Sequence, residues 1–191
     1  MPTIGVALAI PEPWASELQD YRLSVGDTTA TMIPTHITLI PPIEVDEDDL
    51  AEVEKHLTEV ASATSAFRIH LRGTGTFRPV SPVVFVTVVE GISACEQLAV
   101  ALRRGPLSVE LQFPYHPHVT VAHDVAQENL DEAETVLRDY RATFPVVSMG
   151  LYEHDTNGIW QLREELDFGG DTDEEQQADS GHGGGHSSTA N

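Results

Sequence analysis

Along the first 168 residues, short apolar runs alternate with segments in which apolar residues recur every three to four positions. This pattern predicts a fold of both strands and helices. Short runs rich in Val, Ile and Thr predict strands, whereas apolar residues recurring every three to four positions predict helices. The expected strands are Thr3–Ile10, Met32–Ile40, Phe67–Arg72, Val83–Val89, His118–Ala122, Phe144–Leu151 and Gly158–Arg163. The expected helices are Glu12–Ser24, Asp46–Ala63, Ser93–Arg104 and Glu128–Tyr140. We expect Pro41-Pro42 to end the second strand, because proline cannot donate a ladder hydrogen bond.

The order of these elements repeats, since each half of the chain reads strand, helix, strand, helix, strand. Two copies of one unit that share a core usually form a single domain. The predicted fold class is therefore α/β (α+β), with duplicated βαβαβ units forming a bilobal, pseudo-two-fold domain. A central cleft between the two halves is the natural ligand site in such an arrangement.

The composition changes sharply after residue 168. Residues 169–191 read GGDTDEEQQADSGHGGGHSSTAN and contain no large apolar side chain that burial could use to offset ordering entropy. We therefore predict one domain over residues 1–168 and a disordered acidic Gly/His/Ser tail over residues 169–191. His182 and His186 of that tail are expected to be inert.

Charge limits the class of partner. The chain carries 31 acidic against 10 basic residues, a net charge of −21, and its single lysine is Lys55. A protein that holds a long nucleic acid neutralises many phosphates with cations, so long nucleic acids are disfavoured. We expect instead a small nucleotide or a short RNA end as the partner.

Cysteine content and hydropathy indicate the cellular environment that the sequence favours. The lone Cys95 cannot form an internal disulfide, which fits a reducing cytoplasm. No run of 18 apolar residues is present, so no membrane contact is expected. We further expect a monomer.

Two tripeptides of the form H-x-T are the chemical signal. The sequence holds five H-x-[ST] matches, but only those beginning at His36 and His118 lie in expected strands. Residues i and i+2 of a strand share one face, roughly 6.5–7 Å apart. His36 and Thr38 therefore face one way, as do His118 and Thr120. The intervening Ile and Val residues would point into the core.

This pairing suits the cleavage of a phosphodiester. One neutral histidine can deprotonate the nucleophile while a second, protonated histidine protonates the leaving oxygen. A neighbouring hydroxyl can donate to the phosphate oxygen on which charge accumulates. A structural role for both motifs, as polar faces that merely contact solvent, is disfavoured because the two occupy the same place in the repeat.

The two motifs, PTHITLI and YHPHVTVAH, resemble those of the 2H phosphoesterase superfamily. That superfamily includes 2′-5′ RNA ligase-like proteins and RNA 2′,3′-cyclic phosphodiesterases. The resemblance spans about residues 3–166 and includes GTGTFRPVSPVVFVTV between the motifs. It implies a duplicated bilobal fold and histidine-based phosphoesterase chemistry. In RNA-processing members a basic residue often follows the second motif, where this chain has His123.

Four further residues are candidates for substrate binding. Tyr115 stacks on a base or packs on its strand, and the sequence favours neither alternative. Phe77 would flank a base and Arg78 would reach a phosphate, although the sequence slightly favours a plain surface loop. His123 would extend the site or cap the next turn.

The sequence thus predicts a metal-independent phosphodiesterase acting on a 2′,3′-cyclic phosphate or a similar small nucleotide phosphodiester. No metal-ligand motif and no phosphate-binding glycine loop occur, so neither metal nor cofactor is expected. The alternatives are 2′-5′ RNA ligase or RNA-end processing activity, and a non-catalytic nucleotide-binding module. The sequence leaves open which histidine is the base.

Overall fold

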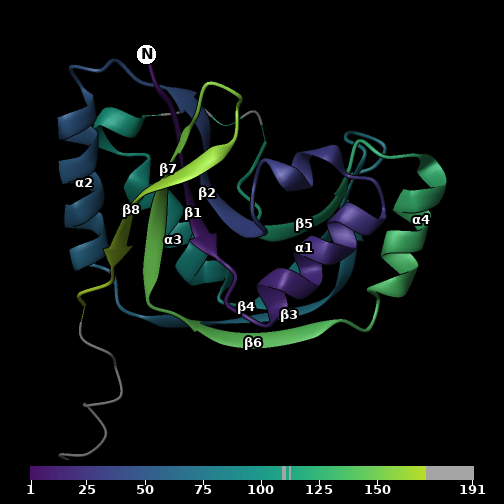
Figure 1. The fold of residues 1–191 in the computed structure, drawn as a ribbon. Coiled ribbons are helices and arrows are strands. Elements are labelled where there is room, and N and C mark those ends of the chain that lie inside the picture. The colour runs from purple at the N-terminus through teal and green to yellow at the C-terminus, as the bar shows by residue number, and fades with distance from the viewer. Residues whose placement is uncertain (109–110, 112, 171–191) are drawn as a thin grey trace, which may run out of the picture.

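A single eight-stranded sheet and four α-helices make up the fold in the computed structural model, which describes residues 1–108, 111 and 113–170. Figure 1 shows the sheet curling through the molecule with the helices packed against it. The strands are β1 (Thr3–Ala9), β2 (His36–Glu44), β3 (Phe67–Thr76), β4 (Val83–Glu90), β5 (His118–His123), β6 (Arg141–Val146), β7 (Ser148–His154) and β8 (Trp160–Asp167). The α-helices are α1 (Trp14–Ser24), α2 (Leu50–Ser62), α3 (Ile92–Leu102) and α4 (Gln127–Val136), and short 3₁₀ turns occupy Thr28–Thr31 and Gly105–Leu107.

The strand order is β6-β3-β4-β5-β2-β1-β7-β8, and every neighbouring pair is antiparallel. The two motif-bearing strands, β2 and β5, are the central pair, but they are joined only at Ile37 and Val119. The sheet therefore consists of two well-paired halves that meet at a narrow seam. This confirms the predicted bilobal α+β architecture.

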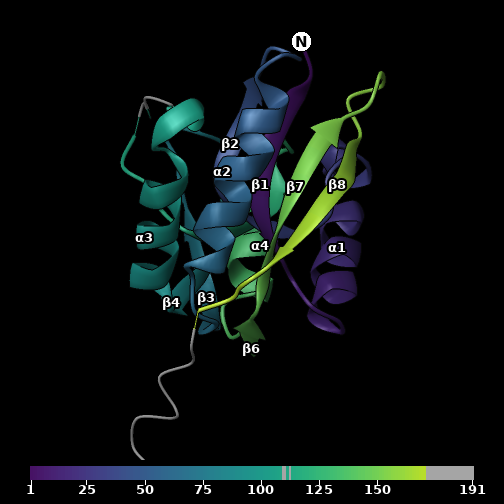
Figure 2. The same cartoon turned by 90° about the vertical axis from the view of Figure 1, so that its left-hand side faces the viewer.

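Two helices cross from one half of the sheet to the other. Helix α1 leaves β1 yet packs against β5, whereas α3 leaves β4 and packs against β2. Helix α2 lies beside α3, as Figure 2 shows, and α4 covers β3, β4 and β5. We call strands β2, β1, β7 and β8 with α2 and α3 the β2 lobe, and strands β5, β4, β3 and β6 with α1 and α4 the β5 lobe. This crossing ties the lobes together across the weakly paired seam.

The core lies between the sheet and these helices. As expected from strand alternation, Ile37 and Leu39 of β2 and Val119 and Val121 of β5 are fully or almost fully buried. Their buried faces leave the other face of both strands free for polar side chains. The hydrophobic pattern of the sequence therefore sets which way the two motifs point.

The predicted end of the second strand was wrong. β2 continues through Pro41 and Pro42 to Glu44. The register with β1 shifts between the pairs Ile4–Ile43 and Val6–Ile40, so the two prolines lie in a bulge. Beyond Ile40 the other edge of β2 also has no partner among the described strands, and this edge tolerates residues that lack an N–H group.

The predicted strand Phe144–Leu151 was also wrong, because the apolar run contains two strands. β6 pairs with β3, whereas β7 pairs with β1 and β8, on the other side of the seam. Val147 alone separates them. An unbroken apolar run does not reveal a change of pairing partner. Helix α4 likewise ends at Val136, short of the expected Tyr140.

The chain remains bound to the fold slightly beyond the expected domain end. The amides of Gly169 and Gly170 donate to the carbonyl oxygens of Ala61 and Thr64, at the end of α2. The rest of the predicted tail, residues 171–191, lies outside the described residues. Within the described ranges, no helix combines the length and apolar character needed to cross a bilayer.

Candidate active site

The first motif begins β2 with its polar side chains on the face opposite the core. The Nδ1–H of His36 donates to the carbonyl oxygen of Pro34 at 2.7 Å, and Nε2 lies 3.1 Å from the Thr38 hydroxyl. A carbonyl oxygen can only accept, so the bond to Pro34 places the proton of the neutral ring on Nδ1. Nε2 of His36 is then the nitrogen that exchanges protons, and in the neutral ring it accepts from Thr38.

The second motif repeats this geometry on β5. The Nδ1–H of His118 donates to the carbonyl oxygen of His116, again at 2.7 Å and again two residues earlier. Nε2 of His118 is therefore the proton-exchanging nitrogen of the second ring. The same local bond in both motifs gives both rings the same tautomer.

The antiparallel register brings the motifs to one place. Because Ile37 lies opposite Val119, continuing the register puts His36 across from Thr120 and Thr38 across from His118. All four side chains line one cleft of about 680 Å³ at the seam between the lobes. The cleft is further lined by Arg22, Thr29, Ile33, Leu39, Pro41, Phe77, Val80, Ser81, Val83, Leu111, Phe113, Pro114, Tyr115, His116 and His123.

An indole ring lies against the first histidine. The Trp160 ring lies nearly parallel to His36, with an angle of 24° and 6.1 Å between ring centroids. Trp160 occupies this place because Gly5 of β1 has no side chain. A Cβ on Gly5 would come within 2.0 Å of the indole. The β7–β8 hairpin thereby supplies one wall for His36.

Two phenyl rings contact the second histidine, Phe77 edge-on and Phe85 tilted at 56°. Phe77 and Phe85 lie 4.9 Å and 5.1 Å from the His118 ring, measured between centroids. Gly75, which pairs with Phe85 across β3 and β4, leaves room for that ring, because a Cβ there would come within 2.7 Å of it. Each histidine is therefore held by an aromatic side chain that a strand glycine admits.

Burial lowers the pKa of both histidines. For His36 burial is the largest cause, the bond to Pro34 opposes it, and the charges of Arg22 and His118 lower the pKa further, to about 4. For His118 burial again lowers the pKa, the bond to the His116 carbonyl opposes it, and the His116 ring adds a smaller lowering. Both rings therefore favour the neutral form in the free protein, and a nearby anion would favour protonation of one of them.

Three of the four predicted substrate-binding residues lie at the cleft, and Arg78 does not. Phe77, Tyr115 and His123 line the cleft. Tyr115 donates its hydroxyl to the Thr38 carbonyl, and the Arg103 guanidinium lies over its ring at 5.8 Å. These contacts favour the packing role over base stacking for Tyr115.

Arg78 is not brought to the cleft. Its guanidinium donates to Asp131 and Glu134 of α4, each at 2.6 Å, and it is not among the residues that line the cleft. The loop position suggested contact with a phosphate, but the carboxylates of α4 are long-range partners that the local sequence does not reveal.

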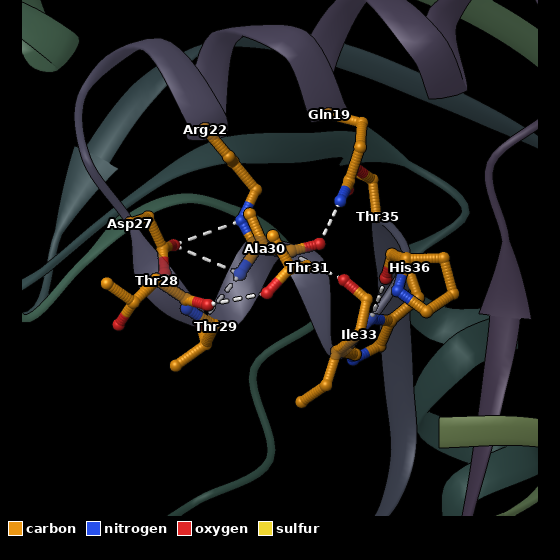
Figure 3. Close-up of polar contacts among 11 residues, drawn as sticks. Gln19, Arg22, Asp27, Thr28, Thr29, Ala30, Thr31, Ile33, Thr35 and His36 are labelled. Carbon is orange, nitrogen blue, oxygen red and sulfur yellow. Dashed lines mark hydrogen bonds and ion pairs between the residues drawn. The ribbon is translucent and has the colours of Figure 1, made fainter. Parts of the chain in front are cut away.

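Sequence reasoning missed Arg22, which is buried and lines the cleft near His36. Figure 3 shows it reaching from α1 to Asp27, Thr29 and Ile33. Among the described lining residues it is the one Lys or Arg. Its place in the last turn of a helix concealed it, because arginine is common there for reasons of the helix dipole. Trp160 was missed as well, since it lies 124 residues after the histidine it contacts.

The chain is similar to known proteins over most of its length. A sequence model of the family described as "2'-5' RNA ligase superfamily" matches residues 10–158. A protein of Halalkalibacterium halodurans named "Putative phosphoesterase BH1439" is 29% identical over 169 residues, covering 86% of this chain and 96% of that protein. A Geobacillus protein with the same kind of name is 27% identical over 161 residues, covering 82% of this chain and 92% of its own length.

Solved structures share the fold. TT0787 of Thermus thermophilus superposes with a TM-score of 0.63 at 22% identity, covering 89% of this chain and all of that one. E. coli LigT in complex with 3′-AMP gives a TM-score of 0.62 at 18% identity, covering 88% of this chain and 99% of LigT. E. coli LigT has also been solved with NADP⁺, at a TM-score of 0.57 and 20% identity, covering 87% of this chain and 97% of LigT.

Proposed function

The chain belongs to the 2′-5′ RNA ligase superfamily, and from that premise we propose that it is a metal-independent phosphodiesterase of small nucleotides. The favoured substrate is a 2′,3′-cyclic phosphate or a similar small phosphodiester. The observation that carries the proposal is the meeting of two H-x-T motifs in one cleft, each with its histidine Nδ1–H bound to a carbonyl. That arrangement leaves one Nε2 from each lobe for the two proton transfers that hydrolysis needs.

The reaction on a 2′,3′-cyclic phosphate balances with these two groups and water. One neutral imidazole takes a proton from water as the water oxygen forms a bond to phosphorus. The bond from phosphorus to one ribose oxygen breaks, and the other histidine, as imidazolium, gives its proton to that oxygen. The product is a phosphomonoester, and the histidines end with exchanged protonation states.

The threonines complete the phosphate site. Thr38 and Thr120 lie on the same strand faces as the histidines, so the Thr120 hydroxyl can donate to a non-bridging oxygen, where charge grows in the transition state. The Thr38 hydroxyl can do the same once His36 Nε2 is protonated and no longer accepts from it. A bound phosphate anion would also favour the imidazolium form of one histidine, which burial otherwise disfavours.

The remaining walls suit a nucleobase rather than a long chain of phosphates. Phe77, Val80 and Phe113 line the cleft, and Val80 and Phe113 are exposed at its mouth. Aromatic and aliphatic surface of this kind stacks on bases with little regard to sequence. The 3′-AMP and NADP⁺ bound by E. coli LigT are ligands of this size and chemistry. Arg22 is the one lysine or arginine among the described lining residues, and it is paired with Asp27. The cleft therefore offers no row of cations, and we expect a substrate with a single phosphodiester.

The test is turnover of a panel of 2′,3′-cyclic mononucleotides, noncyclic dinucleotides and short RNAs ending in a cyclic phosphate. We expect hydrolysis by the wild-type chain, and a loss on the order of 10²–10⁴-fold in kcat for His36→Ala and for His118→Ala. His56→Ala is the matched control, because His56 also begins an H-x-T tripeptide but lies on α2, outside the cleft. If the double variant His36→Ala, His118→Ala turns over substrate at the wild-type rate, the proposal fails.

The same panel separates the alternatives. RNA ligase or RNA-end processing activity would appear as joining or trimming of oligonucleotides with a steep salt dependence, because a longer RNA needs more phosphate contacts. A binding module would hold nucleotides without converting them. An acid–base pair with both tautomers fixed gives a binder no advantage, and this favours the enzyme.

A further inference from the structure

A buried ion pair lies directly behind the first motif. Arg22 of α1 and Asp27 are joined by two hydrogen bonds of 3.1 and 3.0 Å, and their side chains are 4% and 0% exposed. Burying two charges costs desolvation energy that their attraction often fails to recover, so such pairs contribute little to net stability. The Arg22–Asp27 pair is therefore better explained by a role other than stability.

The pair is fully engaged with the segment that leads into β2. Arg22 also donates to the Thr29 hydroxyl at 3.0 Å and to the Ile33 carbonyl at 3.3 Å. Asp27 accepts from the amide and the hydroxyl of Thr29, which caps the 3₁₀ turn at Thr28–Thr31. Figure 3 shows these bonds converging from α1 onto one short loop.

A second side chain of α1 holds the same segment. Gln19, one turn before Arg22 and on the same face of the helix, donates to the Ala30 carbonyl and accepts from the Thr35 hydroxyl. The loop is therefore held on both sides of Pro34, by Arg22 at Ile33 and by Gln19 at Thr35 (Figure 3). The carbonyl of Pro34 is the group that receives the Nδ1–H of His36.

From these contacts we propose that Arg22, with Asp27, is a positioning residue for His36 that fixes its tautomer by holding the Pro34 carbonyl in place. The proposal rests on the proposed function for its catalytic meaning, but not for its structural content. The two histidines then differ in how they are held, because in the part of the chain that the structure describes only the segment of His36 is bound by a buried ion pair. Among the described residues, no ion pair involves segment 113–120, which leads into and carries the second motif.

The guanidinium acts on His36 through its charge as well. The positive charge of Arg22 lowers the pKa of His36, in addition to the larger effect of burial. The other titratable groups about this ring are His118 across the seam, His116 and His123 of the same cleft, and Asp27 bound to the guanidinium. Removing the charge of Asp27 while Arg22 stays in place should therefore not raise the pKa of His36.

The test is nitrogen-15 NMR of the histidine rings in the full chain without substrate, which reports tautomer and pKa for each ring. In Arg22→Gln, we expect His36 to lose its pure Nδ1–H tautomer, because the Pro34 carbonyl is no longer held in place. In Asp27→Asn, the cation stays without its counter-charge, so the pKa of His36 should stay low or fall. His118 is the internal control and should keep its tautomer in both variants.

A surface arginine provides the matched control. Arg163 also bridges two carboxylates, Glu54 and Glu153, but lies outside the cleft, so Arg163→Gln should leave both histidine signals unchanged. The effect on activity is measured with Arg22→Lys, which keeps the positive charge but loses the planar guanidinium and its several donors. We expect kcat to fall on the order of 10–10²-fold with little change in KM, as misplacement of a catalytic group does.

The milder variant Thr29→Val keeps the proposal testable if Arg22→Gln does not fold. It removes only the hydroxyl contacts of Thr29 and should partly disturb the His36 tautomer while leaving His118 unchanged. An unchanged tautomer of His36 in the folded Arg22→Gln and Thr29→Val variants would overturn the proposal. If no phosphodiester is turned over, the proposed function fails while the NMR result still decides the positioning role.

Discussion

The hydroxyl of Tyr115 donates to the carbonyl oxygen of Thr38 at 2.9 Å, and this bond crosses the seam between the two lobes. It joins the segment that precedes the second motif to the strand that carries the first. Because β2 and β5 share only the pair Ile37–Val119, a side-chain bond at this point does much to set how the two histidines face one another. Burial raises the pKa of the Tyr115 hydroxyl, which therefore remains a donor at any working pH.

Removing that hydroxyl should loosen the seam. We expect Tyr115→Phe to lower the free energy of unfolding by about 1 kcal/mol, the usual net value of one hydrogen bond. The kcat of a confirmed substrate should fall more than KM changes, because the histidines move relative to each other. Denaturant unfolding and steady-state kinetics measure the two effects.

Tyr140→Phe is the matched control, since the Tyr140 hydroxyl makes only a long 3.5 Å contact with Glu17 at the surface. Equal losses of kcat in the two variants would contradict a special role for the Tyr115 bond.

The four motif side chains should act as one unit. We expect Thr38→Val and Thr120→Val each to lower kcat by roughly 10–10³-fold, as loss of one transition-state hydrogen bond does. The double variant His36→Ala, His118→Ala should be far less than multiplicatively worse than either single variant, because both groups serve the same step. Multiplicative losses in single-turnover kinetics would show that the histidines act independently.

Activity should peak on the acid side of neutrality. The mechanism needs one neutral and one protonated histidine, and burial lowers the pKa of both, that of His36 to about 4. The profile of kcat/KM should therefore be a bell whose maximum lies below the ordinary histidine value of about 6.5. The alkaline limb of kcat should lie at higher pH, since bound phosphate favours the imidazolium. An optimum of kcat/KM above about pH 8 would contradict this.

Stability should fall as the solution is acidified through the same range. An unfolded histidine binds its proton near pH 6.5, whereas folded His36 does so only near 4. Between these values the unfolded state holds more protons, so the free energy of unfolding decreases as pH falls from about 6.5 to about 4. His36→Asn should flatten this part of the curve, measured as denaturant midpoint against pH. His70→Asn, on β3 outside the cleft, serves as the control, and an equal flattening there would refute the assignment.

Turnover should be insensitive to chelators. The two histidines supply both proton transfers, and the described residues hold no group of three or more His, Cys, Asp or Glu placed to bind a metal ion. After dialysis against EDTA, kcat should be unchanged. A loss that Mg²⁺ or Mn²⁺ restores would place a metal in the mechanism and exclude the histidine-only scheme.

Local pattern predicted the parts of the fold that depend on local physics. Alternation placed His36 and Thr38 on one face of a strand and Ile37 in the core, because side-chain direction in a strand follows from sequence position alone. The strand context also separated the two motifs from the similar tripeptide at His56 on a helix. The same reasoning failed at Pro41-Pro42 and at Val147, where a bulge and a change of partner depend on which strand lies alongside.

The sequence by itself determined the repeated order of strands and helices, the direction in which each motif faces, and the chemistry that two H-x-T motifs can perform. Which strands and helices make up each lobe was decided by the tertiary structure. Only the tertiary structure decided how the motifs meet, because the pair Ile37–Val119 and the bond from Tyr115 join segments far apart in the chain. It also decided that Arg78 turns to α4, while Arg22 and Asp27 lie buried behind His36. The partner of a charged side chain is set by which surfaces pack together, and no local period in the sequence encodes that choice.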